Sequence, residues 1–492
     1  MPHLLTAFGG IIAIPLILSQ GLCLQHDSLT QGHLISTIFF VSGVCTLLQV
    51  TFGIRLPIVQ GGTFALLAPS MAMLSMPEWT CPAWTQNASL VNTTSPEYIE
   101  LQGSIMVGSL FQVLVGFSGL IGFFMRFIGP LTIAPTISLI GLSLYDSAGM
   151  SAGNHWGIST MCVLLGITLS WLICYIFTIS NVLPPEPEQY GYLARTDLKG
   201  DVIGQAPWFR FPYPGQWGLP TVSLAGVVGI LAGVISSMIE SVGDYHACAR
   251  LSGAPPPPKH AINRGIGIEG LGCLLAGAWG TGNGTTSYSE NVGALGITKV
   301  GSRMVIVAGG VLMIIMGLFC KIGAIFTTIP TPVVGGMFLV MFGVISAAGV
   351  SNLQYADMNS SRNMFIFGFS MFSGLVIPNW IFKNPDAIAT GVVELDQLLQ
   401  VLLTPRHGTL QERGIKAWNK IPLDDSSNTL ESSEVYNLPF GISSCLSSYS
   451  WVRYVPFLPP NTPSSQDKTE VDSLETMQQP VKPELIIRSV AL

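Results

Sequence analysis

Charged side chains are scarce in this chain of 492 residues. Asp, Glu, Lys and Arg together make up 10% of it, whereas soluble domains average about 25%. Lys and Arg number 21 against 27 Asp and Glu, so the chain lacks the basic surface that a nucleic-acid partner requires. Mean hydropathy is +0.53. This balance excludes an ordinary soluble domain and favours a protein that lies within a membrane and contacts its lipid.

Metal-ligand and catalytic patterns are also missing. None of the nine cysteines stands in a CxxC or similar spacing. Cys81 lies in a polar stretch, and most of the others lie in apolar runs, where a cysteine acts as a small hydrophobic residue. No nucleophile–base pair or metal-ligand cluster is recognisable. We therefore expect no enzyme activity, no metal site and no cofactor.

Long apolar runs, by contrast, are abundant. A membrane-spanning helix needs about 20 apolar residues, and the clear candidates are 4–24, 34–53, 104–126, 128–148, 157–180, 219–240, 303–328, 332–350 and 363–382. Three further runs are glycine-rich and interrupted: 56–76, 264–280 and 284–298. The first run has no features of a cleavable signal peptide. The sequence predicts an all-α, multi-pass membrane protein with about twelve passes.

A polar break lies between Gly280 and Lys299, within otherwise apolar sequence. Glu290 and Asn291 stand in its middle with no basic residue nearby. An ionisable group at membrane depth is costly and marks a functional site by default. The glycines and hydroxyls around it predict a broken helix that lines a cavity, and Gln60–Ala65 is a similar break in the first half of the chain. The chain is therefore expected to bind or move a polar solute inside the bilayer.

The polar loops indicate an orientation. Residues 78–102 contain two glycosylation sequons, at Asn87 and Asn92, which predict an extracellular loop. Residues 250–264 are basic and predict a cytoplasmic loop. The tail from about 405 is polar and rich in Ser and Pro, and we expect it to be disordered and cytoplasmic.

Several motifs in order resemble one known family. Glu290-Asn-Val-Gly293 followed by Thr298-Lys299 fits the signature of the nucleobase–ascorbate transporters, also called nucleobase:cation symporters of the second type. Further segments that resemble this family are Gln60–Ala65, Ser237–Asp244, Pro255–Pro258, Asn263–Gly265 and Asn359–Arg362. The resemblance covers about residues 3–415 and is nearest to the vertebrate members, which include sodium-coupled ascorbate and nucleobase carriers.

The resemblance implies a fold of fourteen helices in two inverted repeats of seven, with a core domain that holds the substrate and a gate domain. The third and tenth helices are half-helices preceded by short strands that meet at the midplane. On this basis we expect first-repeat core helices at 1–126, a shortened first gate region with a loop at 127–216, second-repeat core helices at 217–328, a shortened second gate region at 329–404 and the tail at 405–492. Elevator-like movement and a homodimer are implied by the resemblance alone.

The same resemblance assigns the substrate residues. Glu240 and Glu290 match two acids that accept N–H groups from a nucleobase. Phe64 lies in the family-like segment Gln60–Ala65, and from its aromatic ring we expect it to stack on the base. Asn291 matches a polar residue that fixes the local geometry, and Tyr288 is a further aromatic candidate. Structural roles remain open for all of them: a helix–helix hydrogen bond for Glu240, a pore-lining carboxylate for Glu290, simple packing for Phe64 and a helix cap for Asn291.

A coupling ion is expected beside these acids. Asp244 lies one helical turn after Glu240, so the two carboxylates share a helix face. Two like charges this close call for a cation between them, either sodium or a proton. Oxygen-bearing residues expected nearby are Ser241, Thr285 and Ser287. Glu269 matches an acidic family position that supports the site, with a structural hydrogen bond as its alternative. His3 matches a histidine in the family's first helix, with a disordered terminal residue as its alternative.

The chain departs from the family pattern in its gate regions and at its start. It begins at Met1-Pro-His3, inside what resembles the first helix, and a single run at 154–180 replaces the sixth and seventh helices. The last helix is reduced to a stub near 402–407. These gaps leave open a transport-incompetent shortened isoform.

The sequence therefore predicts sodium-coupled uptake of a nucleobase such as uracil, xanthine or hypoxanthine across the plasma membrane. Ascorbate uptake is the nearest alternative, but the resemblance implies Pro at position 290 in ascorbate carriers, and this chain has Glu290. A proton-coupled base permease is the third possibility.

Overall fold

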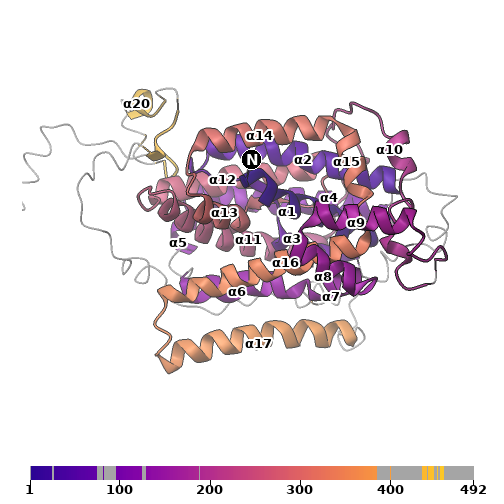
Figure 1. Ribbon diagram of the computed structural model, residues 1–492. Helices are drawn as coiled ribbons and strands as arrows, with labels where there is room; N and C mark the ends of the chain where they lie inside the picture. Colours follow the sequence, from indigo (N-terminus) through magenta and orange to yellow (C-terminus); the bar gives the residue numbers. More distant parts are fainter. Residues whose placement is uncertain are drawn as a thin grey trace, which may run out of the picture.

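The computed structural model describes residues 2–24, 27–74, 81, 96–124, 129–187, 189–384, 399, 435–439, 442–447, 452 and 455–458. Helices dominate this part of the chain, and Figure 1 shows the long ones packed alongside one another. The expected all-α carrier fold with inverted repeats is confirmed.

The same order of elements occurs twice: two helices, a short strand, a half-length helix and another helix. In the first half these are α1 (Pro2–Gly21), α2 (Ser28–Thr51), β1 (Gln60–Gly62), α3 (Phe64–Leu74) and α4 (Pro96–Ser118). In the second half they are α11 (Leu224–Leu251), α12 (Lys259–Trp279), β2 (Thr285–Ser287), α13 (Ser289–Thr298) and α14 (Arg303–Leu318). The two polar breaks of the sequence are the two strand–helix junctions.

The remaining elements follow each repeat. After α4 come α5 (Ile121–Phe124), α6 (Pro130–Ser143), α7 (Tyr145–Gly153), α8 (Trp156–Leu165), α9 (Ile167–Ile179), η3 (Tyr192–Ala194) and α10 (Asp201–Gln205). After α14 come α15 (Cys320–Thr327), α16 (Thr331–Ser351), η4 (Asn352–Tyr355), α17 (Ser361–Lys383) and α20 (Ile442–Ser447).

Two groups of helices pack separately. In the first group, α4 lies against α12, α2 against α14 and α15, and α3 against α11. In the second group, α16 lies against α6, α7 and α8, and α17 lies against α6. Figure 1 shows α6, α16 and α17 below the first group, with α17 outermost. The exposed apolar side chains of α17, such as Phe365 (68% exposed) and Phe372 (70% exposed), are suited to contact with lipid.

Six described helices or continuous helix pairs are long and apolar enough to cross a membrane, and a bent pair makes a seventh. This is fewer than the twelve passes expected, because several apolar runs are divided. The run 157–180 breaks at Gly166, whose φ of 82° ends α8, and the run 303–328 bends by 82° between α14 and α15.

One of the three runs expected to be interrupted is continuous. Residues 264–280 form most of α12, which runs unbroken from Lys259 to Trp279. Its glycines serve close packing rather than a break: a Cβ on Gly270 would lie 2.7 Å from the backbone nitrogen of Val113 in α4. Small residues of this kind let two membrane helices approach closely.

A disulfide joins Cys23, just beyond α1, to Cys81, in the segment after α3. Disulfides persist in oxidising compartments, so the pairing agrees with the extracellular location predicted for residues 78–102. The sequence analysis did not foresee this pairing.

The sequons Asn87 and Asn92 lie outside the described residues. The side chain of His3 also lies outside them, although its backbone lies in α1.

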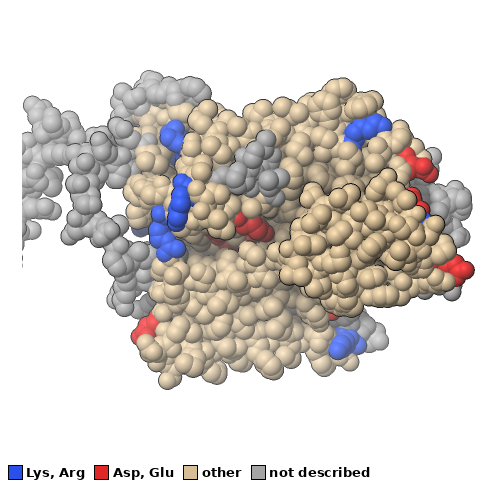
Figure 2. Space-filling view, viewed as in Figure 1, with Lys and Arg blue, Asp and Glu red and all other residues tan. Residues whose placement is uncertain are grey.

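Basic residues gather at the opposite end. Arg55 follows the end of α2, Arg264 lies near the start of α12 and Arg303 begins α14. In Figure 2 blue side chains cluster at the end where Figure 1 places α13. This distribution agrees with a cytoplasmic location under the positive-inside rule.

Part of the tail is folded, contrary to the expectation of a disordered segment from 405 onward. Tyr436 is 1% exposed and Val452 is 1% exposed. The Asn263 amide donates to the carbonyl of Pro456 at 2.9 Å, and Phe457 packs edge-on against Phe117 with ring centroids 5.0 Å apart. Short apolar stretches in the tail thus dock on the end of the molecule where the basic residues gather. The predicted stub at 402–407 lies outside the described residues.

The orientation predicts which thiols a membrane-impermeant maleimide reaches. Cys23→Ser frees Cys81, which we expect to be labelled on intact cells because it lies at the extracellular end. Lys259→Cys, at an exposed position of the opposite end, should be labelled only after permeabilisation. The reverse pattern would show that the molecule is inserted the other way round.

Candidate functional site

The two strands meet in the middle of the first helix group and hold two helix starts together. β1 pairs with β2 in antiparallel register, Gly61 opposite Thr286. The Tyr288 amide donates to the carbonyl of Val59 at 3.1 Å, which extends the pairing to the start of α13. The strands satisfy backbone groups that the broken helices leave free. Both α3 and α13 therefore begin beside the pair, with the positive ends of their dipoles at the site.

α11 carries two buried polar stripes toward this junction. Glu240 and Asp244 form one stripe, four residues apart, and are 6% and 5% exposed. Ser237, Ser241 and Tyr245 form the adjacent stripe at the same spacing, and each is 1% exposed or less. Residues four apart lie on one helix face, so α11 presents acids on one side and hydroxyls on the other.

Asp244 is held by the first residue of α13. The Ser289 hydroxyl lies 2.9 Å from Oδ1 and 3.1 Å from Oδ2 of Asp244. This contact ties α11 to the start of α13, one residue before Glu290. Ser289 was not among the residues predicted from the sequence.

Buried polar atoms without partners converge here. Oε2 of Glu240, Oε1 of Glu290 and the hydroxyl of Tyr288 have no hydrogen-bond partner among the described residues. Leaving such groups unpaired costs about 1–3 kcal/mol each, and more for a charged group. Two carboxylate oxygens and one phenol therefore offer acceptors and a donor to a ligand that presents complementary groups.

Two glycines from different elements make room for the Tyr288 ring. A Cβ on Gly61 of β1 would lie 2.4 Å from Cζ of Tyr288, and one on Gly10 of α1 would lie 3.0 Å from it. Tyr288 is 2% exposed. Its position is thus fixed by backbone on two sides.

Phe64 lies where the two helix groups meet. It is 4% exposed and packs edge-on against Phe342 of α16, with ring centroids 5.6 Å apart and an interplanar angle of 85°. Phe338 stacks on Phe342 in turn, with centroids 5.5 Å apart. Phe64 therefore links the half-helix α3 to the second helix group.

Glu269 of α12 is the centre of a separate polar cluster. It is 2% exposed, and its carboxylate accepts from Gln112 at 3.2 Å and from Tyr245 at 3.0 Å. Its other donors are Ser237 (3.5 Å), Ser241 (2.7 Å), Thr286 (3.2 Å) and Ser287 (3.2 Å). A carboxylate has about four acceptor positions, and these six donors are more than enough to occupy them, so Glu269 is satisfied by protein alone.

The residues predicted to hold an ion are accordingly divided. Ser241 and Ser287 donate to Glu269. Thr285 lies elsewhere: its backbone amide contacts Sγ of Cys273 at 3.3 Å, and its hydroxyl has no partner among the described residues. Asn291, fully buried, donates to the carbonyl of Pro57 at 3.2 Å and so holds the loop before β1.

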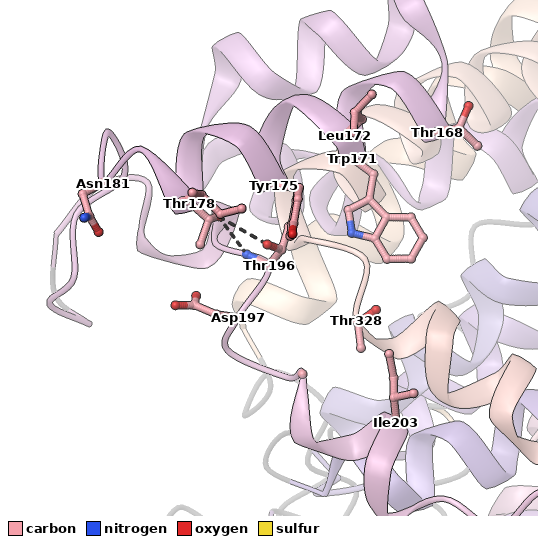
Figure 3. A pocket seen from close by; sticks show the side chains of 12 residues that line it. Thr168, Trp171, Leu172, Tyr175, Thr178, Asn181, Thr196, Asp197, Ile203 and Thr328 are labelled. Carbon is pink, nitrogen blue, oxygen red and sulfur yellow. Dashed lines mark hydrogen bonds between the residues drawn. The ribbon is translucent and has the colours of Figure 1, made fainter.

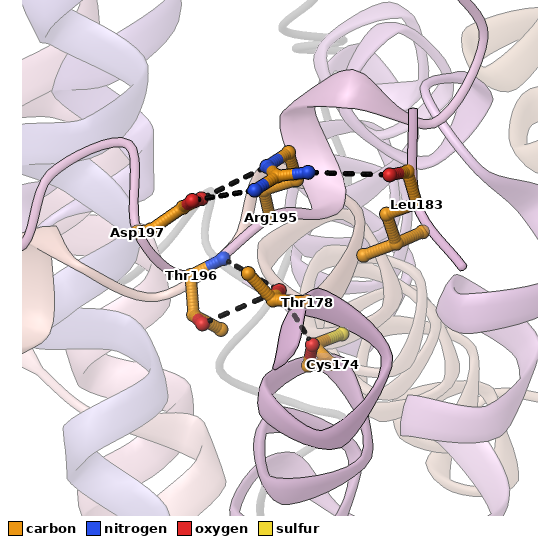
Figure 4. A network of polar contacts seen from close by, with 6 residues as sticks. All are labelled: Cys174, Thr178, Leu183, Arg195, Thr196 and Asp197. Atoms are coloured by element: carbon orange, nitrogen blue, oxygen red, sulfur yellow. Dashed lines mark hydrogen bonds and ion pairs between the residues drawn. The ribbon is translucent and has the colours of Figure 1, made fainter. Parts of the chain in front are cut away.

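Among the described residues, no cationic side chain forms an ion pair with the acidic cluster. The ion pair within these ranges joins Arg195 and Asp197, in the loop after α9 (Figure 4). Hydrogen bonds from Arg195 hold the pKa of Asp197 below its usual value. The same ranges contain no group of three or more His, Cys, Asp or Glu side chains arranged to hold a metal ion.

A cavity of about 690 Å³ opens near that loop rather than at the acids. Figure 3 shows Trp171, Leu172 and Tyr175 of α9 on one side of it, with Ile203 and Thr328 on the other. None of the acidic residues of α11, α12 or α13 lines it. The cavity is mainly apolar and does not take part in the chemistry of the strand junction.

Comparison with known proteins then gives the family. A permease family model matches residues 1–161 and 157–383. The chain is 45% identical to human solute carrier family 23 member 2 over 523 aligned residues, covering 93% of this chain and 80% of that protein. It is 33% identical to nucleobase-ascorbate transporter 1 of Arabidopsis thaliana over 466 residues, covering 84% and 87%. The chain belongs to the nucleobase–ascorbate transporter family.

Two further proteins are similar to the chain. Rat solute carrier family 23 member 1 is 45% identical over 518 residues, covering 93% of this chain and 85% of the rat protein. Among solved structures, the transmembrane domain of the cyanobacterium bicarbonate transporter BicA matches with a TM-score of 0.40 and 13% identity, covering 81% of this chain and 96% of that one. Family membership makes the chain a multi-pass membrane protein of a transporter family.

Several site residues escaped the sequence analysis. Ser237, Tyr245 and Gln112 contact Glu269, and Ser289 contacts Asp244. The four-residue spacing of Ser237, Ser241 and Tyr245 was a visible signal for a second polar face. Gln112 and Phe342 gave no such signal, because they reach the site from helices that are distant in sequence.

The Tyr288 packing predicts a large effect from one added methyl group. In Gly61→Ala the new Cβ meets the tyrosine ring against paired backbone, and we expect a loss of about 1–3 kcal/mol of stability, measured as a lower thermal unfolding temperature in detergent. Gly309→Ala in α14 is the matched control, since its Cβ meets nothing within 4 Å. Equal unfolding temperatures for Gly61→Ala and wild type would contradict the packing.

Proposed function

We propose that this protein takes up a nucleobase across the plasma membrane, coupled to sodium. The observation that carries the proposal is the pair of buried carboxylate oxygens on Glu240 and Glu290 that lack partners among the described residues. Uracil and xanthine carry ring N–H donors next to carbonyl acceptors. Ionised carboxylates only accept hydrogen bonds, and the Tyr288 hydroxyl supplies a donor for a carbonyl.

Two further features support a flat, neutral substrate. Phe64 presents an aromatic ring at the junction, and stacking a base on an aromatic contributes about 1–3 kcal/mol. The start of α13 directs backbone N–H groups toward the same place, which favours a carbonyl oxygen. A planar ring with alternating donors and acceptors uses all of these groups at once.

Sodium coupling is proposed from the charges around the substrate. Glu240 and Asp244 lie one turn apart on α11, and Ser289, the neighbour of Glu290, contacts Asp244. Among the described residues, no Lys or Arg forms an ion pair with these acids. Their mutual repulsion is strong in a medium of low dielectric constant. A sodium ion beside Asp244, the acid that Ser289 positions, offsets that repulsion. Binding of the ion therefore favours binding of the substrate at the same acids.

The first test concerns the substrate acids. Glu240→Gln and Glu290→Ala should each reduce uptake of labelled base strongly, because losing one partner of a buried charge-assisted contact costs about 2–5 kcal/mol. Glu186→Gln, at an exposed loop position, is the control for loss of a carboxylate. Uptake at the wild-type rate in both site variants, with normal surface expression, would refute this assignment.

The second test concerns the ion. In Asp244→Asn one charge is removed while Ser289 keeps an oxygen partner, so we expect a shift of the sodium activation curve to higher concentration and a smaller change in base affinity. Asp357→Asn, an exposed acid in the loop before α17, is the control. A sodium curve identical to wild type would assign Asp244 a structural role, and uptake independent of sodium in wild type would favour proton coupling.

The third test separates bases from ascorbate. Ascorbate is anionic at neutral pH and would face Glu240 and Glu290 together, so repulsion acts against it. We expect excess ascorbate to leave base uptake unchanged. Competitive inhibition by ascorbate at concentrations similar to those of uracil or xanthine would overturn the substrate assignment but not the family.

A further inference from the structure

Three arginines from separate elements meet at the cytoplasmic end. Arg264 of α12 donates from Nε to the carbonyl of Gly53 at 2.8 Å, and Gly53 lies only two residues before Arg55. Contacts with the tail place Arg303 near Arg264. Its Nη1 lies 3.5 Å from the carbonyl of Val435, and Nη2 of Arg264 lies 2.7 Å from the carbonyl of the next residue. Adjacent carbonyls thus bring the guanidinium groups of Arg264 and Arg303 close together.

This arginine cluster, Arg55, Arg264 and Arg303, lacks a counter-charge among the described residues. The ion pair of the described ranges lies in the loop after α9. Arg264 is 3% exposed, and neither its Nη1 nor Nε of Arg55 has a hydrogen-bond partner there. Arg55 also lies within electrostatic reach of both other arginines. Carbonyl oxygens accept from Nε and Nη2 of Arg264, but they carry no net charge to neutralise the guanidinium group. A buried charge without a counter-ion is unfavourable, so the cluster favours an anion.

The chemistry of the cluster selects the kind of anion. A guanidinium group presents a planar fork of N–H donors that fits phosphate oxygens in pairs. Arg55 and Arg303 are partly exposed, whereas Arg264 is buried behind them. A phosphate can therefore approach from the cytoplasm between the two outer arginines. Basic pockets between membrane helices on this side suit the headgroups of anionic lipids.

We propose that Arg55, Arg264 and Arg303 form a phosphate-binding site at the cytoplasmic end, separate from the substrate site. The bound phosphate bridges the loop after α2, the start of α12 and the start of α14. It also lies next to Val435 and Tyr436, so it fastens the folded part of the tail. The phosphate can come from an inner-leaflet phospholipid headgroup or from free phosphate, and both sources present the same oxygens.

The experiment uses the full chain in nanodiscs and measures thermal unfolding, so it does not depend on transport. One arm compares phosphatidylcholine nanodiscs with discs that also contain a phosphoinositide bisphosphate. The other arm adds inorganic phosphate to pure phosphatidylcholine discs. The variants are Arg303→Gln and Arg55→Asn; Asn tolerates the positive φ of 63° at position 55. Lys259→Gln is the control, because it removes an exposed positive charge from the same end.

We expect the unfolding temperature of wild type to rise with the phosphate source and to saturate. A rise with phosphoinositide alone assigns the site to a lipid headgroup, and a rise with inorganic phosphate assigns it to a free anion. Both cluster variants should need at least about tenfold more of that source for half the rise, as expected for one lost charge-assisted contact. Lys259→Gln should behave as wild type. The absence of a rise in both arms, or an equal loss in Lys259→Gln and the cluster variants, would overturn the proposal.

Discussion

Buried carboxyl groups without cationic side chains beside them constrain this structure more than any other feature. Glu240, Asp244 and Glu269 are each at least nine-tenths buried, and the described residues place no Lys or Arg against them. A protein can keep such groups only if hydrogen bonds or bound species compensate for the lost water. The acids differ in how their oxygen atoms are hydrogen-bonded. Glu269 is surrounded by hydroxyl and amide donors, Asp244 is held by Ser289, and Glu240 and Glu290 keep oxygen atoms unpaired.

The strand pair makes this arrangement compatible with a membrane. Two broken helices expose backbone groups that lipid cannot satisfy, and β1 and β2 satisfy them with each other. The same pairing brings Gly61 against Tyr288 and directs the starts of α3 and α13 toward the acids of α11. The strand pairing thus both satisfies the backbone and fixes the geometry of the junction. Phe64, the first residue of α3, contacts Phe342 of the second helix group from there.

Local sequence patterns were enough to predict the broken segments at Gln60 and Glu290, because glycines combined with polar side chains interrupt the apolar run and disfavour a continuous helix. The break expected in 264–280 was wrong, since glycine also serves close packing against α4, and composition does not distinguish the two uses. Contacts between distant segments were beyond such patterns. The Cys23–Cys81 disulfide, the donation from Gln112 to Glu269 and the docking of Tyr436 on Arg264 each depend on how the helices pack in three dimensions.

If Glu240 and Glu290 bind ring N–H groups, a base methylated at its ring nitrogens should bind more weakly than the parent base. Calorimetry on the purified chain in sodium buffer would compare whichever of uracil, xanthine and hypoxanthine binds best with its analogue methylated at the ring nitrogens. A methyl group removes the donor and leaves the ring stacking surface. We expect at least about tenfold weaker binding for the analogue, because a charge-assisted hydrogen bond is lost. Equal affinity for both compounds, or no binding of any of the three bases, would contradict it.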